Sequence, residues 1–415
     1  MANKKIAFII TKLELGGAQK SVLYSVKNLN RPPIKTYLLC GKGGYLDKEA
    51  KKNVKGLFFI PDLVREISPL KDLKAFLQIR KRLKNIKPDI VHTNSSKAGI
   101  LGRLAAASII KGPKIVHTVH GFSFYEGQKP LKKHFYVTAE KLLAKVTDKL
   151  IFVSREDMDT ALKLKITKAL QCTLIRAGVE VRRKQDFKDF DKAAKLRKLG
   201  LKENAKIILC TANLKPQKNP LDMIKAAEIV CKKEPSCVYL YTGTGPLKQA
   251  AQKLISRRKL KNNFKLLGHR KDISELLAAA DVFSLSSLWE GLPMALVEAL
   301  FMSVPGVCYD SGGIREVLKN GKNGFLSDDD DVLADRITNA VTDDNIRKKL
   351  AEMIFRNKHF RADALKRQIL PEIFMDIPHS RICAAIIRMA ARHIYRIMRE
   401  KHFIQVYQKL AYSTS

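Results

Sequence analysis

Residues 281–300 read DVFSLSSLWEGLPMALVEAL, a short apolar run followed by a turn and a longer apolar segment. The run DVFSLSS predicts a strand, and the Gly-Leu-Pro turn at 291–293 opens a predicted helix. The first amides of such a helix have no intrahelical acceptor and can hold anionic or hydroxyl oxygens. Glu290 and Glu298 flank the turn, eight residues apart. By themselves they fit either ligand-binding carboxylates or surface carboxylates at the start of a helix.

Apolar runs alternate with helical-looking segments on both sides of this stretch, which predicts parallel sheets covered by helices. Six such runs lie in the first half, at 6–10, 36–40, 57–60, 89–93, 114–119 and 149–154. Five lie in the second half, at 206–212, 237–243, 264–268, 281–287 and 304–310. The polar stretch 181–195 between the halves predicts a linker. We therefore expect an N-terminal domain over 1–182 and a C-terminal domain over 183–365, each doubly wound and Rossmann-like.

The composition indicates a globular protein that is attracted to anions. Of 415 residues, 46% are hydrophobic, and 78 Lys and Arg against 40 Asp and Glu leave a net charge of +38. Such an excess favours nucleic acid, phosphorylated ligands or anionic lipid as partners. The seven cysteines form no CxxC pair, and no apolar stretch is long enough to cross a bilayer. We expect a cytoplasmic protein whose membrane contact, if any, is peripheral.

Residues 366–415 predict a basic helical tail. Within it, the segment 381–399 places arginines on one helical stripe and apolar residues on the other. This pattern fits a helix on an anionic membrane surface, and it equally fits a terminal helix that packs on the core with its arginines in water.

Gly16 and Gly17 follow the first predicted strand and precede a helical segment. A glycine pair there would let a phosphate approach the backbone closely, although such pairs also serve tight turns.

Taken together, these motifs resemble the retaining glycosyltransferases of glycosyltransferase family 4, also called group 1 glycosyltransferases. The resemblance covers about residues 4–335, and its strongest element is the Glu290/Glu298 pair. Supporting motifs are the GGAQ loop at 16–19, VHGF at 119–122, ANLKPQKNP at 212–220, GTGP at 243–246, LGHRKDI at 267–273 and SGGIREVL at 311–318. The resemblance implies the GT-B fold, with the two domains facing a central cleft.

The resemblance also implies roles for individual residues in holding a nucleoside diphosphate sugar. Glu290 would contact the transferred sugar, Glu298 the ribose, and Lys218 the leaving diphosphate. His120 would lie near the reacting sugar, and Arg270 close to the base. The remaining positions implied to bind the donor are Gly16, Gly17, Gly243, Gly245, Gly291, Leu292, Met294 and Ala295.

One position departs from the family pattern. Asn213 stands where the family usually has an arginine, five residues before Lys218. Asparagine can donate a hydrogen bond but brings no charge, so the diphosphate site is expected to be weaker or remodelled, with Lys215 as a candidate substitute.

The implied reaction transfers a sugar, from a UDP-sugar by preference, to an acceptor hydroxyl with retention at the anomeric carbon. The leaving phosphate would itself accept the proton, and the scheme requires neither metal nor other cofactor. The acidic run 328–331 is interpreted as a solvated loop. A carbohydrate or lipid-linked acceptor, as in surface polysaccharide or glycolipid assembly, would suit the positive charge.

Two other classes stay open on the residues alone. A sugar-nucleotide epimerase could share the two-domain fold, because fold does not fix function. A non-catalytic polyanion-binding protein would fit the charge, but aromatics are only 7% and no nucleic-acid module is recognisable, so nucleic acid is not expected as a partner.

Overall fold

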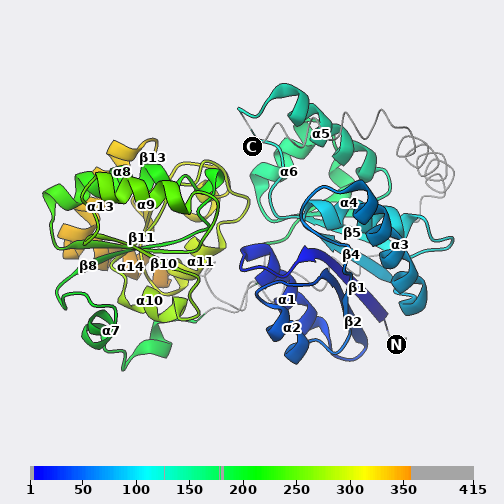
Figure 1. Cartoon of the computed structure of the whole chain (residues 1–415), viewed down its shortest axis with the longest axis horizontal. Helices are drawn as coiled ribbons and strands as arrows, with labels where there is room; N and C mark the ends of the chain where they lie inside the picture. Colours follow the sequence, from blue (N-terminus) through cyan, green and yellow to red (C-terminus); the bar gives the residue numbers. More distant parts are fainter. Residues whose placement is uncertain (1–3, 126, 177, 179–181, 357–415) are drawn as a thin grey trace. The chain divides into compact units, whose positions relative to one another are not determined.

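The structure is a computed structural model, and it describes residues 4–125, 127–176, 178 and 182–356 (Figure 1). These residues form two compact units, one ending at residue 178 and the other beginning at residue 182. The predicted basic tail, including 381–399, lies outside the described residues. The predicted domain boundaries stay predictions.

The N-terminal unit is a parallel sheet of seven strands in the order β3-β2-β1-β4-β5-β6-β7. The strands are β1 (Lys4–Lys12), β2 (Ile34–Gly41), β3 (Leu57–Phe59), β4 (Ile90–Asn94), β5 (Lys114–Val119), β6 (Lys149–Phe152) and β7 (Cys172–Leu174). The helices are α1 (Gly17–Leu29), α2 (Asp47–Asn53), α3 (Pro69–Ile86), α4 (Ser96–Ala107), α5 (Pro130–Ala144) and α6 (Arg155–Lys163), with a 3₁₀ turn at Ala169–Gln171.

Both faces of this sheet are covered, because β1 is apolar on both sides. Ile6 and Phe8 pack in the cluster that contains α1 and α2 residues, whereas Ala7 and Ile9 pack with α3 and α4. This alternation follows from the two-residue period of a strand. The result is a doubly wound layer, as the sequence predicts.

The C-terminal unit repeats the arrangement with six parallel strands in the order β10-β9-β8-β11-β12-β13. The strands are β8 (Lys206–Thr211), β9 (Cys237–Thr242), β10 (Phe264–Gly268), β11 (Val282–Leu285), β12 (Gly306–Tyr309) and β13 (Gly324–Ser327). The α-helices are α7 (Lys192–Lys198), α8 (Pro220–Lys233), α9 (Lys248–Arg257), α10 (Ile273–Ala279), α11 (Met294–Phe301), α12 (Ile314–Val317), α13 (Asp330–Thr342) and α14 (Asp344–Arg356). Short 3₁₀ turns lie at Lys184–Phe187 and Pro216–Lys218.

Two local expectations were only partly right. The stretch expected to be a linker adjoins the boundary between the two units, but it contains the 3₁₀ turn at Lys184–Phe187 and most of α7, which begins at the cap Asp191. The acidic run 328–331, expected to be a solvated loop, is largely exposed, but the Asp329 side chain accepts a hydrogen bond from the Val332 amide and caps α13, which begins at Asp330. In both places a carboxylate satisfies helix amides that have no other acceptor.

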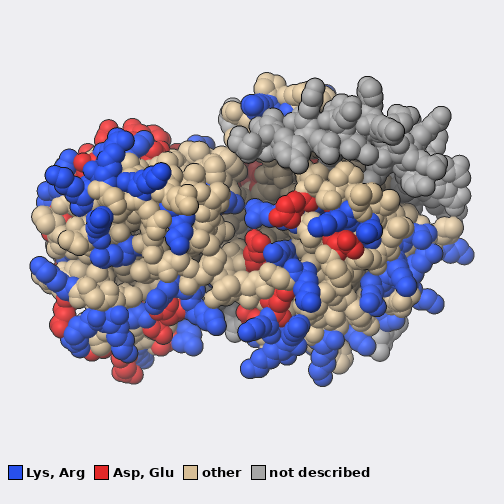
Figure 2. All heavy atoms as spheres, in the orientation of Figure 1, with Lys and Arg blue, Asp and Glu red and all other residues tan. Residues whose placement is uncertain are grey.

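Lys and Arg side chains outnumber Asp and Glu on the visible face of both units (Figure 2). Within the described part of the chain, no helix is both long and apolar enough to span a membrane.

Candidate active site

In the C-terminal unit the strand order reverses between β8 and β11. Open α/β sheets bind ligands at such a switch point, beyond the carboxyl ends of the strands. The segment 212–219 follows β8 and the segment 286–293 follows β11. The sequence motifs that carry Lys218 and Glu290 therefore lie where this fold presents a ligand site.

An ion pair joins these two loops. Lys218 Nζ contacts Glu290 Oε1, and the two side chains are 19% and 7% exposed. Lys218 ends a 3₁₀ turn, and the next residue, Asn219, adopts the left-handed conformation that leads into α8. The pair places a cation and a carboxylate together at the switch point.

Neutral hydrogen bonds fix the same two loops around the ion pair. Gln217 donates from Nε2 to the Trp289 carbonyl at 2.8 Å, and the Leu288 amide donates to the Gln217 carbonyl at 2.9 Å. Ser286 Oγ donates to the Asn219 carbonyl at 2.8 Å. Gln217 and Ser286 did not stand out in the sequence, because a lone amide or hydroxyl carries no motif of its own. Their contacts tie the loop that carries Lys218 to the loop that carries Glu290.

The glycines of the SGGI motif allow close packing against Glu290. The Gly313 amide donates to the Glu290 carbonyl at 2.9 Å. A Cβ on Gly313 would lie 1.4 Å from the Gly291 carbonyl oxygen, and Gly312 has a φ of +47°. Side chains at either position would displace the turn that follows β11.

Gly243 and Gly245 meet the loop after β8 in the same way. A Cβ on Gly243 would lie 2.1 Å from the Ala212 carbonyl oxygen, and one on Gly245 would lie 2.4 Å from that of Leu214. Asn213 lies between these two contacts and is half-buried. The GTGP motif thus supports the segment that leads to Lys218.

The other predicted donor residues of this unit lie on or beside α11 and after β10. Gly291 and Met294 are buried, whereas Leu292, Ala295 and Glu298 are half-buried. No side chain caps the amino end of α11.

Arg270 forms a bidentate ion pair with Asp272, with Nε to Oδ1 at 2.8 Å. The Arg270 guanidinium lowers the pKa of the Asp272 carboxyl, which Lys195 also contacts. Arg270 is therefore held in one orientation by a carboxylate on its own loop.

Cys210 on β8 lies behind the ion pair. Burial raises the pKa of its thiol to about 12, and Lys218 and Glu290 perturb that pKa in opposite directions. The thiol is therefore protonated at neutral pH and does not act as a nucleophile.

In the N-terminal unit, the switch point lies between β1 and β4. Gly16 immediately precedes α1 and Gly17 is its first residue, and no side chain caps this helix start. Gly16 is extended, and a Cβ there would meet only the end of the flexible Gln19 side chain. The glycine pair thus lies beside the switch point, and the packing around Gly16 does not require a glycine there.

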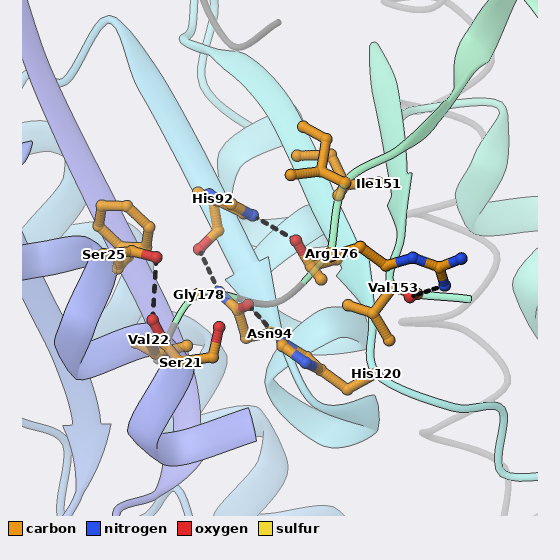
Figure 3. A pocket seen from close by; sticks show the side chains of 13 residues that line it. Ser21, Val22, Ser25, His92, Asn94, His120, Ile151, Val153, Arg176 and Gly178 are labelled. Atoms are coloured by element: carbon orange, nitrogen blue, oxygen red, sulfur yellow. Dashed lines mark hydrogen bonds between the residues drawn. The ribbon is translucent and has the colours of Figure 1, made fainter. Parts of the chain in front are cut away.

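His120 follows β5 at the neighbouring strand end and is held by Asn94 at the end of β4 (Figure 3). His120 Nε2 lies 2.9 Å from Asn94 Oδ1, and Asn94 Nδ2 donates to the His92 carbonyl at 3.3 Å. The second bond orients the amide, so that Oδ1 faces the histidine and accepts a hydrogen bond from Nε2–H. Burial lowers the pKa of His120 to about 4, so the ring is neutral at pH 7.

A small cavity of about 40 Å³ opens beside these residues, and Figure 3 shows His92, Asn94 and His120 around it. Thr118 Oγ1 lies 2.7 Å from His92 Nε2. Burial lowers the pKa of His92 to about 3. The cavity lining thus combines neutral polar groups such as these with apolar side chains and the basic residue Arg176. The sequence motifs single out His120, but neither His92 nor Asn94.

Among the residues that the structure describes, no group of three or more His, Cys, Asp or Glu side chains is arranged to hold a metal ion. The metal-independent scheme stays a prediction.

Comparison with known proteins extends these observations. The family described as "Glycosyl transferases group 1" matches residues 191–356, and the one described as "Glycosyltransferase Family 4" matches residues 15–183. An Escherichia coli relative named UDP-Gal:alpha-D-GlcNAc-diphosphoundecaprenol alpha-1,3-galactosyltransferase is 35% identical over 354 residues, covering 82% of this chain and 89% of its own.

Solved structures agree on the fold. The Anabaena protein HepE in complex with UDP and glucose matches with a TM-score of 0.75 at 20% identity, covering 89% of this chain and 99% of its own. WaaG, described as a glycosyltransferase involved in lipopolysaccharide biosynthesis, matches with a TM-score of 0.70 at 18% identity, covering 92% and 99%.

The two sheets and the order of the motifs along the chain are those of a GT-B glycosyltransferase. This chain belongs to the group 1 glycosyltransferases of glycosyltransferase family 4. That membership confirms the predicted fold class and enzyme class, and it decides for sugar transfer over the epimerase and the non-catalytic polyanion binder.

Proposed function

We propose that this glycosyltransferase transfers a sugar from a UDP-sugar to a hydroxyl of a lipid-linked saccharide, with retention at the anomeric carbon. The ion pair of Lys218 and Glu290 at the β8/β11 switch point is the observation that carries the proposal. The E. coli relative, by its name, uses UDP-Gal and a GlcNAc-diphosphoundecaprenol acceptor. UDP-galactose is accordingly the first donor to test.

Lys218 supplies positive charge where the leaving diphosphate gains negative charge. Preorganised charge of this kind stabilises a transition state without needing to reorient during the reaction. The contact with Glu290 holds the ammonium in place before the donor binds. The Glu290 carboxylate also lies beside the turn at 291–293, where it can accept hydrogen bonds from sugar hydroxyls.

The uncapped amino end of α11 adds backbone amide donors next to this pair. Helix amino ends favour anions through their free N–H groups and the helix dipole. Catalysis on this account is positioning plus charge stabilisation, and the leaving phosphate oxygen takes the proton of the attacking hydroxyl. Neither step calls for a protein nucleophile or a metal.

His120 contributes a neutral ring near the sugar. Its Nε2–H is directed to Asn94, so Nδ1 carries the lone pair that can accept a hydrogen bond from a hydroxyl. Gly16 and Gly17 offer backbone amides to the diphosphate. We place the enzyme in surface polysaccharide or glycolipid assembly, at the cytoplasmic side of a membrane that holds the acceptor.

The test is sugar transfer by the purified full chain with a panel of UDP-, GDP- and ADP-sugars. The acceptor is a detergent-solubilised GlcNAc-diphosphate-polyprenol, and the product is analysed by mass spectrometry and proton NMR. The proposal expects transfer from one UDP-sugar and an α-linked product from its α-linked donor. A β-linked product would contradict retention, and transfer only from a GDP- or ADP-sugar would contradict the donor assignment.

A further inference from the structure

The helices α3 and α5 share one face of the N-terminal sheet with α4 between them (Figure 1). Side chains of α3 and α4 pack in one apolar cluster with β1 and β4. The opposite sides of α3 and α5 are turned away from this core. They form an outward face that contains none of the residues proposed to act in sugar transfer.

Each of these two helices contains a single acidic residue, and both acids are turned inward to cations on α4. Asp72 of α3 contacts Lys97 Nζ at 2.7 Å, with both side chains at most 15% exposed. Glu140 of α5 contacts Arg103 Nη2 at 2.9 Å, and Arg103 is fully buried. The outward face is therefore left without a carboxylate from either helix.

Basic residues occupy that outward face. On α3 these are Lys71, Lys74, Lys81, Arg82 and Lys84, all exposed, whereas Lys132, Lys133 and Lys141 of α5 are half-buried. Figure 2 shows Lys and Arg side chains gathered over the edge of the unit where α3 lies. Their positive charge has no acidic counterpart on the same two helices.

Large aliphatic side chains lie among these cations. Leu70 and Leu77 of α3 are 77% and 53% exposed, and Leu131 and Leu142 of α5 are 71% and 57% exposed. Leu70 and Leu77 are seven residues apart, and Leu131 and Leu142 are eleven apart, so each pair lies on one helical stripe. Ile110, just after α4, adds a further side chain that is 76% exposed.

We propose that this α3/α5 face, defined by the lysines, arginine and leucines above, docks on an anionic membrane surface. A surface that mixes aliphatic side chains with lysines suits a bilayer. The aliphatic side chains can enter the boundary of the acyl chains, and the lysines can contact lipid phosphates. Nucleic acid would need the lysines but gains nothing from exposed leucines, since bases stack on aromatic rings. The choice of partner rests on the proposed lipid-linked acceptor.

The test is co-sedimentation of the purified full chain with phosphatidylcholine vesicles, with and without phosphatidylglycerol, at low and high salt. Neither donor nor acceptor is present. The proposal expects binding that needs phosphatidylglycerol and weakens with salt. Two variants probe the face: Leu70→Ser with Leu77→Ser and Leu131→Ser, and Lys74→Glu with Lys81→Glu. Each should lower the vesicle partition coefficient by roughly 10-fold or more.

Matched controls carry the same chemical changes elsewhere. Leu170→Ser removes an apolar side chain that is 95% exposed in the same unit, and Lys253→Glu with Lys261→Glu changes the charge equally on the other unit. Both should bind vesicles like wild type. Unaltered vesicle binding of the two α3/α5 variants would overturn the proposal.

Transfer to a detergent-solubilised acceptor separates this inference from the proposed function. The α3/α5 variants should keep wild-type transfer in detergent, which also shows that they fold. Vesicle binding without any sugar transfer would contradict the proposed function alone. Transfer with no vesicle binding would contradict the membrane face alone.

Discussion

Lys218 and Glu290 are 72 positions apart in the sequence and form an ion pair between the loops that follow β8 and β11. Both side chains are largely buried, so removing either one would leave the charge of the other buried without a partner and would lower stability. The pair also holds a cation at the proposed diphosphate site. These effects can be measured independently.

Lys218→Met should reduce kcat by roughly 100-fold or more, since a preorganised charge at the leaving group is lost. It should also lower the free energy of unfolding by about 3 kcal/mol, because the Glu290 carboxylate is left buried without its cation. The double variant Lys218→Met/Glu290→Leu should recover part of that stability and none of the activity. Urea unfolding and steady-state kinetics check both parts. Recovery of activity in the double variant would contradict a role in transfer.

Asn94→Leu should lower transfer by about 10-fold with little change in donor binding, because His120 loses the acceptor that fixes its tautomer. Asn94→Asp should instead raise the pKa of His120, since a carboxylate would face the ring. Imidazole NMR shifts followed over pH measure this change. An unchanged His120 titration in the Asp variant would contradict the assigned contact.

Acidification should destabilise the N-terminal unit through its buried histidines. The pKa values of His92 and His120 are lowered by burial to about 3 and about 4 in the folded chain, against about 6.5 unfolded. Between the folded and unfolded values the unfolded chain binds more protons, so stability falls as pH drops below about 6.5 and continues falling to about 3, the folded pKa of His92. Urea midpoints at stepped pH test this for wild type and His92→Gln. The variant should lose less stability than wild type over the same range.

Gly313→Ala should displace the turn at 291–293 and weaken donor binding, because its Cβ would lie 1.4 Å from the Gly291 carbonyl oxygen. We expect a loss of about 2 kcal/mol in stability. Gly200→Ala is the matched control: it also replaces a glycine, at a φ of +69°, but meets nothing within 4 Å. It should cost about 1 kcal/mol and leave donor binding unchanged. Equal donor affinities in the two variants would contradict the steric argument.

The sequence predicts the long buried strands well because apolar runs bounded by turns carry a strong signal. It missed the edge strands β7 and β13, of three and four residues, because CTL and GFLS contain polar residues or glycine, whereas the equally short edge strand β3 was predicted from its apolar run LFF. The polar stretch 181–195 looked like a linker because its helical parts are short and charged. Its helical character appears only through the Asp191 cap and contacts such as that of Lys192 with Asp281.

The sequence predicted the site residues that belong to motifs. It did not predict those whose role depends on a contact with a residue distant in the sequence. Lys218, Glu290 and His120 stand in recognisable motifs, but Gln217, Ser286 and Asn94 act through partners distant in the sequence. Asn94 does carry one signal, since it is the polar last residue of β4. In a doubly wound sheet that position faces the ligand side.

Titration calorimetry of the full chain with UDP tests most directly whether Lys218 and its loop form the donor site. The account predicts that UDP binds to wild type and to the control Lys232→Met, a surface lysine of α8, with equal affinity. Lys218→Met should bind at least ~10-fold more weakly, as loss of a charged contact to phosphate implies. Equal affinity of Lys218→Met and wild type would contradict the account.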